Sequence, residues 1–438
     1  GDATSNAGVS SESVGFEVGS INIAGNATGS LGILNYAAST LTTNAETSTG
    51  DANASSTGVV VQGAEDLDLD VSGNVAGTWG ARQLAVGTFN ATAQSVNGTG
   101  AGTNADIDAD GAGFSGTSTD VDISGNGNLT QIAQLSGVSN ATTIGDSTGD
   151  LASANVDLDA TGGDYTGSPG NITISGNGNV QGDGVTTGSS SATGVTSAAT
   201  ATGDLNAGGL VMDDSNLNIN GAGNTLGRGL IGTWAADING DYVNSDAFDI
   251  TAETTTGAAT AGNTGGTAAD FDAVGISGSG TVTVGPSAGT ITGIAGAAGI
   301  ISATTTTGAA DSDTDADLFG IQNVNLQGGR DGSSLLDGRA QGAFTTSSNS
   351  VTGNATADSD VNAYGFDGNG STAAVNGNIN ALAEISNVVI AMTTTGTATA
   401  NATGNAVGIQ DYAITLEGSG VITADASSQI TAQSSTIS

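Results

Sequence analysis

Cysteine, histidine and lysine are absent from this 438-residue chain, and proline occurs only twice, at Pro169 and Pro286. The lack of cysteine excludes disulfides, thiolate metal ligands and thiol nucleophiles. The lack of histidine and lysine removes the commonest general bases and the Schiff-base nucleophile. Serine and threonine are abundant, but the usual bases that activate them are missing. The sequence therefore predicts a protein that is not an enzyme.

Positive charge is almost absent too. The chain has 43 acidic residues and a net charge of −39, and its basic residues are Arg82, Arg228, Arg330 and Arg339. Nucleic-acid binding needs clustered cations, and anionic membrane surfaces attract basic segments, so neither partner is expected. No apolar run approaches the ~20 residues that a membrane-spanning helix needs. We therefore expect no membrane insertion.

Glycine, by contrast, is plentiful, at 73 residues, and it marks an internal repeat. A glycine followed closely by a large apolar residue recurs nine times along the chain. From Phe16 to Ile409 there are 393 residues over eight intervals, about 49 each, with spacings from 43 to 66. The longest interval carries an apparent insertion around residues 237–242. The anchors are Gly15-Phe16, Gly58-Val59, Gly113-Phe114, Gly163-Asp164-Tyr165, Gly209-Leu210, Gly275-Ile276, Gly320-Ile321, Gly365-Phe366 and Gly408-Ile409.

Each repeat reads as a few short strands. Segments such as Ile172-Thr173-Ile174 alternate aliphatic and small polar residues, the pattern of a half-buried strand, and usually end at glycine. A threonine-rich segment follows, often closing on a glycine such as Gly308 or Gly396. Almost no helix is expected. A unit of this size cannot bury its own apolar face, so stacking predicts an all-β solenoid of about nine repeats. A string of small β-sandwiches is the less favoured alternative.

The repeat divides the chain into one array without separate domains. Residues 1–16 form the closing part of a repeat, 16–408 eight full repeats, and 409–438 an incomplete last repeat. The 29 residues after Ile409 and the first 16 together make 45, within the commonest spacings of 43 to 45. This agreement with the repeat spacing predicts that the tail of one subunit and the head of the next complete a shared repeat. A window cut from a longer repeat protein, or chance, would also explain it. The predicted subunit interface includes Gly1, Asp2, Ala3, Phe16, Ile430, Ile437 and Ser438.

Alternating aspartates are the candidate metal ligands. The segment containing Asp106, Asp108 and Asp110 matches the opening of a calcium-binding EF-hand loop, but Thr117 replaces its bidentate glutamate. A second run alternates over residues 311–317, and we expect such aspartates to bridge Ca²⁺ between stacked repeats. A solvated acidic face is the alternative. The candidate calcium ligands are Asp106, Asp108, Asp110, Asp311, Asp313, Asp315 and Asp317.

Three further patterns suggest binding. Trp79 and Trp234 lie 155 residues apart, close to three repeats, as a sugar-binding or subunit-docking stripe would require, or they fill corners of the core. Asn-x-Ser/Thr sequons, among them Asn90 and Asn354, are sites for glycans. Threonine runs resemble the ladders of ice-binding solenoids, which is a third hypothesis for function.

The glycine-anchored repeats rich in threonine, alanine, asparagine and aspartate resemble secreted bacterial β-strand-repeat surface proteins, which are adhesin-like or fibre-forming. The resemblance implies export to the cell surface and a structural or adhesive role, and it transfers no functional residue. The expected function is a subunit of an extracellular filament or surface layer that binds copies of itself head to tail. The alternative is a stalk or Ca²⁺-dependent module of a surface adhesin.

Overall fold

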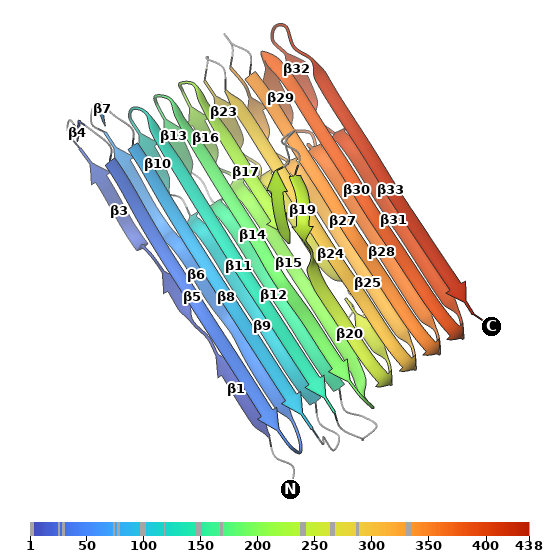
Figure 1. The fold of residues 1–438 in the computed structure, drawn as a ribbon. Coiled ribbons are helices and arrows are strands. Elements are labelled where there is room, and N and C mark those ends of the chain that lie inside the picture. The colour runs from blue at the N-terminus through green and yellow to red at the C-terminus, as the bar shows by residue number, and fades with distance from the viewer. Residues whose placement is uncertain are drawn as a thin grey trace.

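The computed structural model describes residues 4–24, 27–28, 31–72, 75–76, 79–96, 102–117, 119–144, 151–166, 170–236, 242–262, 268–285, 289–329 and 334–437. It confirms the predicted β-solenoid: two long parallel sheets lie face to face, and the chain passes back and forth between them (Figure 1). Among the described residues no segment is helical. No helix capable of crossing a membrane occurs in this part of the chain.

Sheet 1 is the 19-stranded sheet and sheet 2 the 10-stranded sheet. Sheet 1 contains β1 (Ser5–Val9), β2 (Glu12–Val14), β3 (Glu17–Ile23), β6 (Ala52–Val71), β9 (Gly102–Thr117), β10 (Asp120–Ile123), β12 (Leu151–Thr166), β13 (Asn171–Ile174), β15 (Ala198–Asp213), β16 (Asn216–Ile219), β21 (Ala259–Ala261), β22 (Ala269–Ser277), β23 (Thr281–Val284), β25 (Ala310–Gln322), β26 (Asn325–Gln327), β28 (Ala355–Asp367), β29 (Thr372–Val375), β31 (Ala398–Gln410) and β32 (Ala413–Leu416).

Sheet 2 contains β5 (Leu31–Thr47), β8 (Trp79–Ser95), β11 (Gly127–Thr143), β14 (Gly178–Gly194), β17 (Gly223–Ile231), β20 (Phe248–Thr256), β24 (Thr290–Thr307), β27 (Ser334–Thr352), β30 (Gly377–Thr395) and β33 (Ile422–Thr436). Two small pairs complete the described strands: β4 (Ala27–Thr28) with β7 (Val75–Ala76), and β18 (Thr233–Ala236) with β19 (Tyr242–Asp246).

Each repeat forms one rung, with one layer in sheet 1 and one in sheet 2. Neighbouring rungs pair in parallel and in register, so equivalent residues of successive repeats form columns; Ala133 of β11, for example, pairs with Gly184 of β14. A 17-residue strand such as β11 extends about 56 Å, whereas nine rungs stack to only about 43 Å. The molecule is therefore a flat slab, and its strands are longer than its stack is tall (Figure 1).

The repeated glycine marks the place where the two sheets touch. A Cβ on Gly275 would lie 2.2 Å from the backbone N of Ile294 in sheet 2, and one on Gly320 would lie 2.4 Å from that of Arg339. Only glycine fits so close an approach. The glycine column defined by these contacts consists of Gly15, Gly63, Gly113, Gly162, Gly209, Gly275, Gly320, Gly365 and Gly408. Two anchors were thus placed wrongly from sequence, at Gly58 instead of Gly63 and at Gly163 instead of Gly162.

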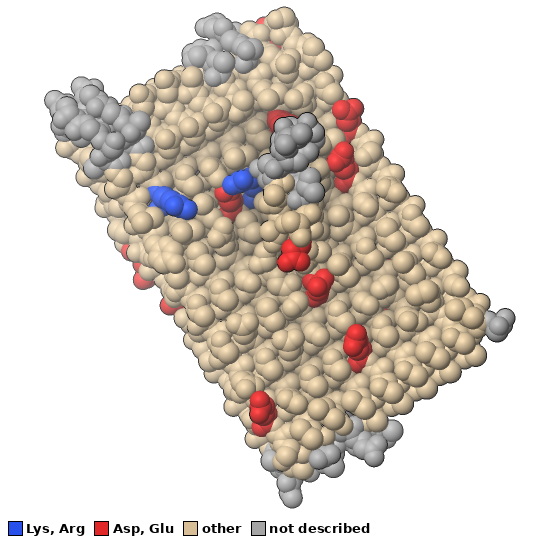
Figure 2. Space-filling view, viewed as in Figure 1, with Lys and Arg blue, Asp and Glu red and all other residues tan. Residues whose placement is uncertain are grey.

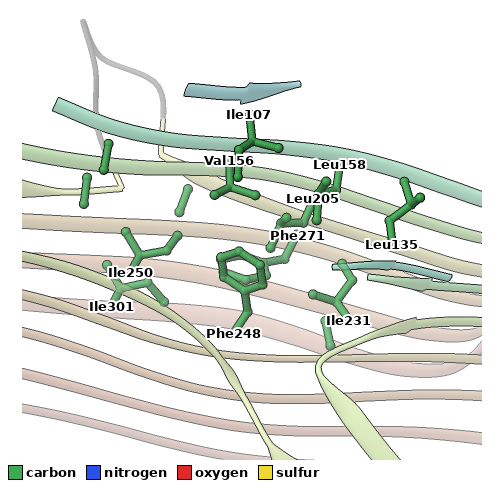
Figure 3. Packing of buried hydrophobic residues seen from close by; sticks show 14 of the residues in the cluster. Ile107, Leu135, Val156, Leu158, Leu205, Ile231, Phe248, Ile250, Phe271 and Ile301 are labelled. Carbon is green, nitrogen blue, oxygen red and sulfur yellow. The ribbon is translucent and has the colours of Figure 1, made fainter. Parts of the chain in front are cut away.

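Two hydrophobic cores lie on either side of this column. One is built mainly of alanine with a few large residues, including Phe89, Phe248 and Phe271. Phe248 and Phe271 meet edge to face with ring centroids 6.5 Å apart (Figure 3). The other core is richer in large aliphatic side chains, such as Leu69 and Ile172. Both cores run through the whole stack, because the strand period of two sends every second residue inward.

The rung that contains β17 and β20 is interrupted. Thr186 pairs with Ile231, 45 positions later, whereas Ser189 pairs with Asp249, 60 positions later. The 15 additional residues include the antiparallel pair β18–β19, which lies over the outer face of sheet 2 (Figure 1). The insertion expected around residues 237–242 is therefore a hairpin, although residues 237–241 lie outside the described part.

Candidate assembly edges and acidic columns

The last rung leaves a long edge open to solvent. In β33, every residue except Ser435 is exposed along its 15-residue length. Within the described residues, β33 pairs with β30 and with no other strand. Its inward side chains Ile422 and Ile430 remain 44% and 38% exposed, although they occupy core columns. A bare parallel edge of this length presents unpaired N–H and C=O groups to another strand.

The first rung forms the opposite edge. Sheet 1 begins with β1, β2 and β3, which pair with β6, and sheet 2 begins with β5, which pairs with β8. Its larger inward apolar residues lie only partly buried at the end of the cores. Phe16, Ile21 and Ile33 pack against one core, and Leu41 against the other. This edge is therefore the incomplete end of the same two cores.

The two edges carry matching residues in the same columns. Following the register from strand to strand, Ile422 shares a column with Ile33, and Ile430 shares one with Leu41. In sheet 1, Ile414 shares a column with Ile21. A second molecule translated by one stack height would therefore place aliphatic residues on aliphatic residues in both sheets.

The interface residues predicted from sequence fall partly on these edges. Phe16 lies between β2 and β3 in the first rung, and Ile430 lies within β33. Ile437 follows β33 and donates its backbone N–H to the Thr393 carbonyl at 3.0 Å. Gly1, Asp2, Ala3 and Ser438 lie outside the described residues. Sequence reasoning missed the apolar residues of β5, because residues 33–41 do not alternate apolar and polar side chains and so carry no clear strand signal.

Aspartates form columns on the outer face of sheet 1. Six of them stand at one position of six successive strands, from β9 to β28, and we call this the six-aspartate column: Asp108, Asp157, Asp204, Asp270, Asp315 and Asp360. Two residues further along each strand runs a mixed column of Asp110, Asp159, Asn206, Asp272, Asp317, Asn362 and Asn405. Neighbouring members are one strand spacing apart, about 4.8 Å.

This crowding changes the titration of the carboxyl groups. Partial burial, followed by repulsion from Asp204 and Asp108, raises the pKa of Asp157 from its ordinary value of 3.8 to about 7. Burial and the neighbouring Asp270 and Asp317 raise the pKa of Asp272 to about 7 as well. Like charges held in a column disfavour the ionised form. The columns thus favour protons or other cations at neutral pH.

Asparagine relieves the repulsion at some positions. Asn362 Nδ2 donates to Asp317 Oδ1 at 3.1 Å, and Asn155 Nδ2 donates to Asp106 Oδ1 at 2.9 Å, each across one strand spacing. An amide in the column supplies a donor where a carboxylate would supply only charge. The mixed column is therefore partly hydrogen-bonded.

The predicted calcium ligands all lie on this face. Asp106, Asp108 and Asp110 occupy one continuous strand, β9, so they form a row along it and do not surround a loop site. The run from Asp311 to Asp317 forms a second row along β25. The structure brings Asp108 into one column with Asp315, and Asp110 into one with Asp317. In the described part of the chain no three acidic side chains are grouped to hold a metal ion. Calcium binding stays a prediction.

Sequence reasoning missed most of the six-aspartate column. Asp157, Asp204, Asp270 and Asp360 each stand in a different repeat, and only alignment of the repeats brings them together. The sequence could have revealed these aspartates, because each one stands at the same distance from the column glycine of its own repeat. The two tryptophans lie on different kinds of element: Trp79 begins β8, whereas Trp234 belongs to the inserted hairpin strand β18.

The opposite face of the slab carries fewer acidic side chains than sheet 1. Sheet 2 carries Arg82, Arg228 and Arg339, and the last two are paired with Asp183 and Asp337. The space-filling view of this face shows mostly uncharged side chains, with a few positive ones and several scattered negative ones (Figure 2). The two faces of the slab therefore differ in electrostatic character. No family model matches the chain, and neither a curated protein nor a solved structure is significantly similar to it.

Proposed function

We propose that this protein is a structural subunit of an extracellular filament or surface layer, assembled head to tail through its two open edges. One observation carries the proposal: the incomplete ends of the same two cores present matching aliphatic columns at opposite edges. The extracellular setting comes from the resemblance to secreted repeat proteins. The proposed binding partner of each subunit is a second copy of the same chain.

Addition of a strand to an exposed edge supplies the physical mechanism. β33 of one copy would pair with β5 of the next, and β31 and β32 with β1 to β3, as neighbouring rungs already pair within the chain. Main-chain hydrogen bonds then provide affinity, and the alternating inward side chains provide register. Burial of Ile422 and Ile430 removes apolar surface from water, which favours association.

The geometry of such a contact determines the form of the assembly. The two edges are different surfaces, so the contact is heterologous, and repeated translation along the stack gives an open polymer. The acidic columns of sheet 1 would lie along the outside of this polymer. Their charge repels the same face of a neighbouring polymer, which limits lateral aggregation.

Electron microscopy of the purified chain, combined with edge variants, tests the proposal. Ile430→Asp places a charge on the inward face of β33, where a second copy would bury it, and should abolish filaments. The matched control is Gln429→Asp, one residue away on the outward face, which should leave them intact. We expect an axial repeat of about 43 Å, the height of nine rungs. Monomeric wild-type protein, or normal filaments from Ile430→Asp, would refute the proposal.

The adhesin module is the second candidate, and the acidic columns are the observation that favours it. A Ca²⁺-dependent stalk would stay monomeric when purified and would gain stability from calcium. The same micrographs, taken with calcium and with EDTA, separate the two functions. Short isolated slabs in both conditions favour the stalk.

A further inference from the structure

The hairpin insertion creates a groove on an otherwise flat face. Between the start of β18 and strands β8, β11, β14 and β17 of sheet 2 lies a hollow of about 470 Å³. On one side the groove is bounded by Gly232, Thr233 and Trp234, at the start of the inserted hairpin. Insertions in repeat proteins map to loops on one face, often the binding face.

The floor of the groove consists of two neighbouring columns of sheet 2, one of which contains Ser136. Val86, Gln134, Val185 and Leu230 stand at equivalent positions of four successive strands. Three strand spacings give this floor a length of about 14 Å. The column of Val86 is apolar at three positions and interrupted by one amide, whereas the column of Ser136 adds hydroxyl groups to the floor.

An aromatic residue closes one end. The indole Nε1 of Trp234 donates to the Ile231 carbonyl at 2.8 Å, which fixes the ring. A Cβ on Gly296 would lie 3.1 Å from Cε2 of the indole, and so the ring rests directly on the sheet at that glycine. Trp234 is only half-buried, and its contacts pre-organise it as a wall of the groove.

A partly buried ion pair forms part of the lining. Arg228 Nε donates to Asp183 Oδ1 at 2.7 Å, and Nη2 lies 2.5 Å from Oδ2, in a bidentate arrangement. Gln181 Nε2 donates to the same carboxylate at 2.6 Å. Asp183 is only 4% exposed, whereas 27% of the Arg228 side chain remains exposed, so the carboxylate is the buried member of the pair. Bidentate pairs of this kind hold their donors in fixed directions.

We propose that this groove binds a neutral oligosaccharide. The indole and the aliphatic floor match the apolar C–H faces of sugar rings, while Gln134, Ser136 and Thr187 offer amide and hydroxyl groups to sugar hydroxyls. The charges of Arg228 and Asp183 compensate each other, and the net charge of −39 repels anionic polysaccharides. This binding goes beyond the assembly role, and it would attach a filament or layer to a glycan-covered surface.

Titration with defined sugars tests the proposal. The probes are the hexasaccharides of β-1,4-glucose, β-1,3-glucose and β-1,4-mannose, with hexagalacturonate as the anionic comparison, monitored by tryptophan fluorescence and calorimetry. We expect at least one neutral probe to bind and hexagalacturonate to bind at least about tenfold more weakly. Failure of every neutral probe at about 10 mM, or equal binding of the anionic one, would overturn the proposal.

Variants locate the binding. Trp234→Ala should weaken binding about tenfold or more, while Tyr36→Ala, an exposed aromatic on the same sheet outside the groove, should not change it. Ser136→Phe fills the floor without removing the indole and should also weaken binding, which guards against a folding defect in the first variant. Unchanged affinity in both groove variants would contradict the assignment. These readouts do not depend on filament formation, so the assembly proposal is tested separately.

Discussion

The acidic columns make the stability of the slab depend on pH in an unusual direction. Asp157 and Asp272 have pKa values of about 7 in the folded chain, and Asp159 and Asp270 of about 6, all above the ordinary 3.8. Between about pH 4 and pH 7 the folded state thus binds more protons than the unfolded chain. The free energy of unfolding must therefore fall as pH rises through this window, and level off above about pH 8.

The size of the effect follows from the same values. One pKa unit corresponds to about 1.4 kcal/mol, so Asp272 alone would cost up to about 4 kcal/mol at alkaline pH if it were fully shielded. These carboxyls are partly exposed, and solvent screening reduces the cost to about 1 kcal/mol each. With at least four contributing groups, we expect a loss on the order of 4 kcal/mol between pH 4.5 and pH 8.

Urea denaturation at a series of pH values measures this loss. The midpoint should fall steadily from about pH 5 to pH 8, and the double variant Asp157→Asn/Asp272→Asn should show a shallower slope and greater stability at pH 8. Asparagine suits these positions, because Asn206 and Asn362 already occupy the mixed column. A midpoint that stays constant, or rises toward pH 8, would refute the reasoning.

The remaining predictions concern other parts of the slab. Calcium added at pH 8 should raise the urea midpoint more than sodium chloride at equal ionic strength. At pH 5, where the columns are protonated, calcium should have little effect on the midpoint. Equal effects of the two salts would argue against specific bridging. Gly320→Ala should destabilise the chain by about 3 kcal/mol because its Cβ would collide with backbone, whereas Gly102→Ala, which has open space, should be nearly neutral by thermal unfolding. Arg228→Gln removes the charged partner of the buried Asp183, which keeps only its neutral hydrogen bond from Gln181, and should cost about 3 kcal/mol. Asp183→Asn in the same chain should recover most of this loss, and no recovery would mean that the pair is not the cause.

Strand formation and stacking were predictable from sequence because they depend on local patterns. Alternation in segments such as Ile172-Thr173-Ile174 gives the strands, and the recurring glycine gives the period. The sequence did not show which glycine of each repeat makes the contact between the two sheets. Gly58 satisfies the local pattern of glycine before an apolar residue, yet Gly63 makes the contact with sheet 2. Which glycine lies at that crossing depends on the partner sheet, and a single strand carries no such information.

The candidate site shows the same limit. The aspartate run from Asp311 to Asp317 is conspicuous in sequence, because its members are neighbours along the chain. The closer arrangement runs across the strands, as in the pair of Asp157 with Asp204, and it emerges only when register is known. The groove beside Trp234 was equally hidden, since its lining comes from four repeats and one inserted hairpin.

The in-register columns also determine how this molecule can change in length over evolution. Removing the 45 residues from Ala310 to Asn354 would join Ala309 to Ala355, which stands in the same column as Ala310. Such a deletion shortens the stack by one rung, about 4.8 Å, and leaves both terminal edges as they were. Loss of a single residue within a strand would instead turn the aspartates of that rung toward the core. Duplication and loss of whole repeats are therefore the mutational steps that this architecture tolerates, and they adjust the size of the slab without altering the surfaces at its ends.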